Sequence, residues 1–276
     1  MTKAPSTLGV IRPRKVGFGF DAALVPRHWV AGKAVSTAMA NALHLIFPKG
    51  ERFFVRSVRR FSRDVEPELG EQVRGFFGQE GRHAAEHERF FAIIQAHGLS
   101  VDRFLQIYET IAYRLIERVS PAKLSLSVTV ALEHYTAIMA EQAFNRGMLE
   151  RIDPSVRELF AWHAAEEIEH KAVAFDVLAT VDDSYALRMA GMALATVLLL
   201  GFWGLGATMF LRQEKVGWRQ VVRELRELRQ HNPILRTVFL RGIREYLRRD
   251  FHPWDLDNLA LARDYLAGMD ATLSTV

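Results

Sequence analysis

The sequence contains no cysteine. This absence excludes a disulfide framework, a thiolate zinc site, a cysteine-ligated iron–sulfur cluster and a cysteine nucleophile. Any transition metal would therefore have to be held by imidazole and carboxylate groups. We also expect no secretory signal, because residues 1–33 have no apolar core and carry Pro5, Pro13 and Pro26. These residues are predicted to form an irregular N-terminal arm.

An excess of one charge is also missing, because 36 basic side chains are nearly balanced by 32 acidic ones. Basic residues gather only in residues 212–249, which hold eleven Lys or Arg against four Glu. Glu224 and Glu227 lie at helical spacing from neighbouring arginines, which is typical of a solvated helix face. We predict no nucleic-acid partner. Residues 212–276 are expected to form a basic, helical C-terminal extension.

One long apolar run extends from Met189 to Leu211 without a charged side chain, between Arg188 and Arg212. Its length is sufficient to span a bilayer. A buried bundle helix and a dimer interface are the alternatives, so a homodimer stays open. The basic residues that follow favour a segment that re-enters or lies on the membrane. We expect an apolar, membrane-associated helix over residues 186–211, in a cytoplasmic protein attached to the cytoplasmic membrane.

Strand patterns are absent as well, since no alternating apolar runs lie between turn dipeptides. Helical patterns fill the chain from residue 34 onward and are punctuated by Pro and Gly. Besides the apolar run, helices are expected at 34–47, 51–63, 67–97, 101–119, 122–149, 154–181, 218–229, 234–249 and 256–267. The sequence thus predicts an all-α protein whose long helices form a bundle over residues 34–185.

Two of these helices contain the same tetrad, Glu80-Gly-Arg-His83 and Glu167-Ile-Glu-His170. At a spacing of three residues, a carboxylate and an imidazole stand on one helix face and can ligate the same ion. One such tetrad arises easily by chance. Two tetrads on separate long helices, each with a preceding helix that offers a glutamate, match the dinuclear carboxylate bundles.

The preceding helices offer Glu51 and Glu133 as the remaining metal ligands. Glu133 interrupts a strongly apolar run, where a charge is costly unless it is paired or metal-bound. Glu51 follows Pro48-Lys-Gly50, and in a first helical turn it could simply complement the helix dipole. Three other glutamates could replace it: Glu66, Glu68 and Glu71.

More histidines are present than this ligand set requires. If the tetrad helices are antiparallel, His87 and His163 lie at the same height, about 8 Å from the tetrads along the axis. We predict that they flank the metal pair as catalytic residues, acting as an extra ligand, a proton relay or a substrate contact. The alternative is two buried histidines bonded to Glu86 or Glu166.

The other polar residues have plainer interpretations. His134 adjoins Glu133 but points about 100° away on a helix. Asp176 could orient a ligand histidine or be an ordinary bonded polar group. His252 is expected to pack rather than bind. Four further histidines are given no functional role: His28, His44, His97 and His231.

Several of these segments resemble a mostly bacterial family described as predicted metal-dependent hydrolases. The matching stretches are Phe47–Phe54, Gln79–His87, Trp162–Asp176 and Phe251–Asp255. The resemblance covers most of the chain and implies a ferritin-like four-helix bundle with additional C-terminal helices. It also strengthens Glu51 as a ligand, because the Pro-x-Gly-Glu context belongs to the family pattern.

A carboxylate-rich pair of metal positions suits either O2 activation or hydrolysis. The helical Glu and Glu-x-x-His arrangement is associated with di-iron proteins. We therefore predict a di-iron, O2-activating oxidoreductase of the hydroxylase, desaturase or N-oxygenase type, acting on an apolar or lipid-like small molecule. Manganese or zinc could replace the two iron ions, and a separate reductase would supply electrons. The alternatives are a dinuclear metal-dependent hydrolase and a non-catalytic, membrane-associated metal-binding protein.

Overall fold

The computed structural model describes residues 10–273, and the side chains of residues 10–269. The all-α prediction is confirmed, since the only β pairing in this range is an isolated bridge between Val30 and Ile152. The α-helices are α1 (Ala34–Arg59), α2 (Pro67–Arg89), α3 (Phe91–Ala96), α4 (Asp102–Tyr108), α5 (Ala122–Asn145), α6 (Pro154–His170), α7 (Val173–Val181), α8 (Tyr185–Gln213), α9 (Trp218–His231), α10 (Arg241–Tyr246) and α11 (Leu259–Leu273). Two π-helical segments follow α4 and precede α10, over Glu109–Glu117 and Leu235–Leu240.

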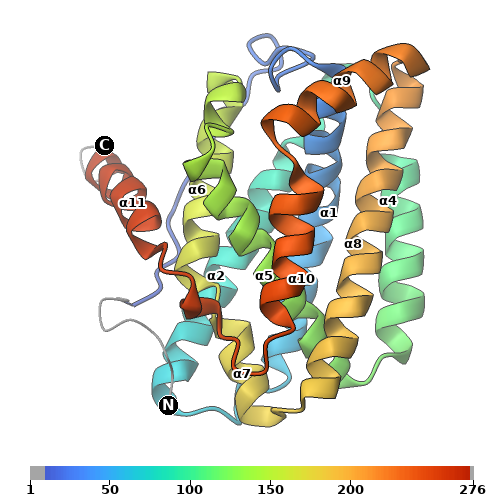
Figure 1. The fold of residues 1–276 in the computed structure, drawn as a ribbon. Helices are drawn as coiled ribbons and strands as arrows, with labels where there is room; N and C mark the ends of the chain where they lie inside the picture. The colour runs from blue at the N-terminus through green and yellow to red at the C-terminus, as the bar shows by residue number, and fades with distance from the viewer. Residues whose placement is uncertain (1–9, 274–276) are drawn as a thin grey trace.

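Four helices form the centre of the bundle (Figure 1). Helix α1 packs against α2, α5 against α6, and the two pairs contact each other through α1 with α5 and α2 with α6. The facing sides of α1, α2 and α5 carry buried apolar residues of the larger core, and α6 contributes most of its buried apolar residues to a second cluster that it shares with α5 and α11. Because each helix turns one face to the same interior, polar residues at helical spacing on those faces converge.

Helix α1 differs from the helix boundary predicted at Pro48. The sequence predicts two helices separated at Pro48, but the helix continues through Pro48 and Gly50 without interruption. Both residues are buried, and the Tyr108 hydroxyl donates to the carbonyl of Ile46 at 3.5 Å. Packing against α4 therefore stabilises a segment in which proline leaves one helix hydrogen bond, that to the carbonyl of His44, unmade.

Two other predicted helices are broken instead. The predicted helix 67–97 is interrupted at Phe90, and the predicted helix 154–181 breaks after His170. At the second break, the buried Lys171 donates hydrogen bonds to the carbonyl of Leu256 and to Asn258 Oδ1, at 2.6 and 2.7 Å. The C-terminal segment thus fixes the end of α6 through contacts that no local pattern reveals.

Helix α8 contains the apolar run and packs along α1 and α5. One of its faces is buried, including Met192, Leu199 and Trp203, whereas Val197 and Leu200 are exposed on another. Among the described residues, α8 is the one helix whose length and composition would allow it to cross a membrane. Its membrane contact stays a prediction.

The N-terminal arm, as far as it is described, lies against the bundle as an irregular segment. Ile11, Val25 and Trp29 are buried in the core. The arm runs directly over α2, where a side chain at Gly75 would collide with Ile11. This contact places Arg14 beside the second tetrad, where it pairs with Glu166.

Candidate metal centre

The central helices bring together six predicted ligands in the interior. Each of these residues is at most 3 % exposed. They are Glu51 on α1, Glu80 and His83 on α2, Glu133 on α5, and Glu167 and His170 on α6. The three-residue spacing of each tetrad aims its carboxylate and imidazole at the same point, as expected for one helix face.

The six side chains form overlapping groups rather than separate pairs. One nitrogen of His170, Nε2, lies 3.1 Å from a carboxylate oxygen of Glu80 and 3.4 Å from one of Glu133. His83 Nδ1 lies 3.8 Å from Glu80 and 3.7 Å from Glu167. In both groups the candidate donor atoms are within 4.8 Å of one another. Glu80 belongs to both groups, so two bound ions would share it as a ligand.

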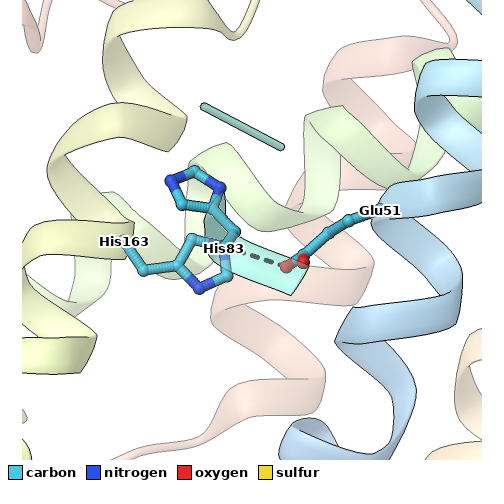
Figure 2. Close-up of side chains that lie close together, drawn as sticks. All are labelled: Glu51, His83 and His163. Atoms are coloured by element: carbon cyan, nitrogen blue, oxygen red, sulfur yellow. Dashed lines mark ion pairs between the residues drawn. The ribbon is translucent and has the colours of Figure 1, made fainter. Parts of the chain in front are cut away.

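A third group consists of Glu51, His83 and His163, from three different helices. Figure 2 shows these side chains pointing toward one another, with His163 Nε2 lying 3.6 Å from Glu51. His163 also bonds to Glu167 through Nε2, at 2.9 Å. His163 therefore stands at the edge of the cluster, where a seventh ligand or a catalytic residue would be placed.

The residues fit a metal because their polar atoms are otherwise unsatisfied. Among the described residues, nine buried donor and acceptor atoms of the six predicted ligands have no hydrogen-bond partner. They are both carboxylate oxygens of Glu51, Glu80 and Glu133, one oxygen of Glu167, Nδ1 of His83 and Nε2 of His170. Each unpaired buried polar group costs about 1–3 kcal/mol. Metal ions would satisfy these atoms together.

Electrostatics agree with this interpretation. Burial, together with the charge of Glu80, raises the pKa of Glu51 well above its usual value. Burial and the charge of Glu167 raise the pKa of Glu133 to about 8. Burial lowers the pKa of His170, but the surrounding carboxylates of Glu133, Glu167 and Glu80 outweigh this and raise it well above the usual value. Without metal, protons must therefore neutralise the cluster, and cations would displace them.

Each tetrad histidine is held from behind by a residue of the opposite tetrad helix. His83 donates through Nε2 to Glu166 at 2.9 Å, and Glu166 pairs with Arg14 at 3.1 Å. His170 donates through Nδ1 to the amide oxygen of Gln79 at 2.8 Å. Such outer partners fix the tautomer of a ligand histidine and its orientation. In both cases the nitrogen that faces the cluster is left free to bind a metal.

A chain of buried imidazoles leads away from the cluster. His163 Nδ1 lies 2.6 Å from His87 Nε2, and His87 Nδ1 lies 2.8 Å from His44 Nδ1. The antiparallel spacing predicts that His87 and His163 lie at the same height, and the first contact agrees with this, but their catalytic roles stay predictions. Burial and mutual repulsion lower the pKa of all three imidazoles, which keeps them neutral. Neutral imidazoles can both donate and accept, so the chain can carry a proton.

Two apolar cavities flank the cluster. A cavity of about 170 Å³ ends at His163 and Glu167, and a smaller one of about 80 Å³ ends at Glu51. Phe47, Thr136 and Met139 line both cavities and lie between them. An apolar molecule could therefore reach the cluster from either side without passing through water.

The structure rejects some candidate residues. The replacements considered for Glu51, namely Glu66, Glu68 and Glu71, are exposed on the first turns of α2 or just before it. Asp176 accepts from His252 at 2.9 Å and orients no ligand histidine. As the sequence predicts, His134 points away from the site, and it donates to the carbonyl of Gly242 at 3.1 Å.

Other functional candidates were missed. His44 is not a bystander, because it ends the imidazole chain. Gln79 and Glu166 each come one residue before the glutamate of a tetrad, and a polar residue at that position is the signal that could have identified them. Arg14 has no comparable signal, since only the path of the arm brings it to Glu166.

Comparison with known proteins finds one match. No curated protein and no solved structure matches the chain. A family model described as "Predicted metal-dependent hydrolase" matches residues 12–257. The expected O2-activating oxidoreductase is therefore wrong, and the hydrolase alternative is favoured. Carboxylate and imidazole ligands serve redox and hydrolytic metals alike, so the ligand set could not separate the two chemistries. The match spans most of the chain, which belongs to this metal-dependent hydrolase family.

Proposed function

We propose that the protein hydrolyses an ester or amide bond of an apolar substrate at a pair of divalent metal ions. The observation that carries this proposal is the convergence of nine unpartnered buried donor and acceptor atoms, of those described, on one point of the bundle. The family match supplies the reaction class. An external reductase and O2, which the oxidoreductase would need, have no role in hydrolysis.

Six residues would hold the two ions: Glu51, Glu80, His83, Glu133, Glu167 and His170. Four carboxylates balance the charge of two divalent cations, which makes the buried cluster neutral when loaded. Zinc, manganese and iron(II) are all compatible with oxygen and imidazole donors. When bound, such ions would activate a water molecule and polarise the carbonyl group of the scissile bond.

The remaining side chains perform tasks that need no metal. His163 would take a proton from the attacking water through Nε2, once Glu167, which accepts from Nε2 at 2.9 Å, binds a metal ion instead. Its Nδ1 faces His87, so the proton can pass from His163 to the buried imidazoles of His87 and His44. The apolar cavity walls exclude bulk water and leave the scissile bond as the polar part of the substrate that the cluster contacts.

The deciding experiment combines metal analysis with a hydrolysis screen. The purified protein should hold two metal ions per chain, lose them to a chelator, and regain hydrolysis of an apolar ester or amide when zinc, manganese or iron(II) is restored. A non-catalytic metal-binding protein would regain metal without activity toward any member of the panel. Glu133→Gln, which removes one predicted ligand, should lower metal content and hydrolysis together.

A further inference from the structure

A third apolar hollow lies on the surface beside the larger cavity. It is a groove of about 1000 Å³ between α8, α9 and the π-helical segment Leu235–Leu240. Its floor includes Trp203, Ala207 and Phe239. Groove and cavity share part of their walls, formed by Met39, Trp203, Leu228, Asn232 and Ile234. The groove thus adjoins the larger cavity and extends the apolar surface that ends at His163.

The smaller cavity has no such extension. It is bounded by the π-helical segment Glu109–Glu117 and by α1, α5 and α8, and its walls include Phe54, Tyr108 and Leu198. None of its described lining residues lines the groove. Two apolar spaces of unequal volume therefore meet at the cluster: a smaller one beside Glu51, and a larger one that continues from His163 toward the surface groove.

We propose that the substrate is a neutral ester or amide with a hydrocarbon arm on each side of the scissile bond, one short and one long. This inference rests on the proposed hydrolase function. The short arm occupies the cavity beside Glu51, and the long arm fills the cavity beside His163 and continues into the groove. Water adds across the scissile bond, so one arm leaves with the carboxylic acid and the other with the alcohol or amine.

The volumes set the expected lengths. A cavity of about 150 Å³ accommodates benzene, with six carbons. By this scale, the smaller cavity takes an arm of roughly three carbons and the larger one roughly seven, before the chain enters the groove. Each methylene buried in these spaces should improve kcat/KM about fourfold, until the space is filled.

Two glycines on α8 provide a matched pair of variants. Gly204 lines the groove, whereas Gly201, one turn earlier, lines none of the described hollows. Both are exposed, and an added Cβ would meet no described atom within 4 Å at either position. Gly204→Phe and Gly201→Phe should therefore both fold, since replacing glycine in a helix interior costs nothing in helix propensity.

The test is a series of esters in which the acyl and alcohol arms are lengthened independently. On one side, kcat/KM should stop rising or fall beyond about three carbons, and on the other it should rise past seven. Gly204→Phe should lower kcat/KM for long-arm esters tenfold or more and leave short-arm esters unchanged. Gly201→Phe should match the unmodified protein. Ala112→Leu, in the wall of the smaller cavity, should reduce tolerance of the short arm alone.

Equal tolerance on both sides, or equal effects of the two glycine variants, would overturn the proposal while leaving the hydrolase function standing. Binding to the metal-free protein provides a readout that does not depend on hydrolysis. A fluorescent probe with a C12 chain should bind the metal-free protein and its Gly201→Phe variant equally, and the Gly204→Phe variant at least tenfold more weakly. If the protein hydrolyses nothing, the proposed function fails, and this difference in binding still decides whether the long hollow takes a hydrocarbon chain.

Discussion

The two helix hairpins that carry the cluster, α1–α2 and α5–α6, supply the same ligand types but support them differently. His83 is backed by the carboxylate of Glu166, which Arg14 holds in place. His170 is backed by the neutral amide of Gln79. A carboxylate behind a ligand histidine increases its basicity more than an amide does. Two metal ions held by these hairpins would therefore be inequivalent, despite the repeated tetrad.

The difference extends to the third imidazole. His163 joins Glu51 and His83, so the His83 side has two imidazoles while the His170 side has one. Nitrogen donors and an anionic outer partner favour tighter binding of a transition metal. A duplicated motif can thus form one site that would hold a metal ion strongly and one that would hold it weakly. The larger cavity reaches the cluster between these two sites, at His163 and Glu167.

Removing Glu80, the residue that the two donor groups share, should have the largest effect on metal binding and hydrolysis. Glu80 belongs to both donor groups, so Glu80→Ala should release both ions and lower hydrolysis on the order of 10³-fold or more. Metal content by elemental analysis and kcat/KM measure the two losses. The control is Glu88→Ala, an exposed glutamate on the same helix that pairs with Arg52. Retention of one ion per chain in Glu80→Ala would show that Glu80 does not bridge.

Giving both tetrad histidines an amide partner should remove the difference between the two metal sites. Glu166→Gln gives His83 an amide partner of the kind that His170 already has. In a metal titration, the affinity of one binding step should fall by about 10–100-fold, and the affinity of the other should stay unchanged. Glu158→Gln, at an exposed position of the same helix, is the control. Weakening of both steps would mean that Glu166 supports the whole cluster.

Much of this site follows from local spacing. The tetrads on α2 and α6 give Glu80, His83, Glu167 and His170 a common face, and a lone charge in an apolar run marks Glu133. These positions depend only on helix periodicity, which a sequence displays directly. Their burial in one place agrees with that periodicity, and their role as ligands stays a prediction.

The remainder depends on contacts between distant segments. Arg14 reaches Glu166 from a position 152 residues away, and Lys171 fixes the break after His170 through residues 256 and 258. The continuation of α1 through Pro48 depends in the same way on packing against α4. Tertiary packing overrides local propensity in such cases, so no pattern within a single helix could reveal them.

The imidazole chain provides a smaller test, because it lies on one side of the cluster only. His87→Leu should leave metal content unchanged and lower kcat by about 10²-fold, since it interrupts proton transfer from His163. His134→Leu replaces a buried histidine outside the site and controls for packing. Equal losses in the two variants, or a loss of metal in His87→Leu, would contradict a relay.

The smallest effect concerns the stability of the metal-free protein, in which Glu133 has no cation to balance it. Its folded pKa is raised to about 8 from a usual 4.5, so between these values the folded state binds a proton that the unfolded state has lost. Stability should therefore fall as the pH rises from about 4.5 to 8. Glu133→Gln should raise the metal-free Tm by several degrees at pH 8 and flatten this slope, because it removes the buried charge. Thermal melts in chelator at pH 5 and pH 8 measure both changes, and an unchanged slope would mean that other members of the cluster hold the proton. With metal restored, the same substitution should lower the Tm, since a carboxylate that costs stability when the site is empty becomes a ligand when it is filled.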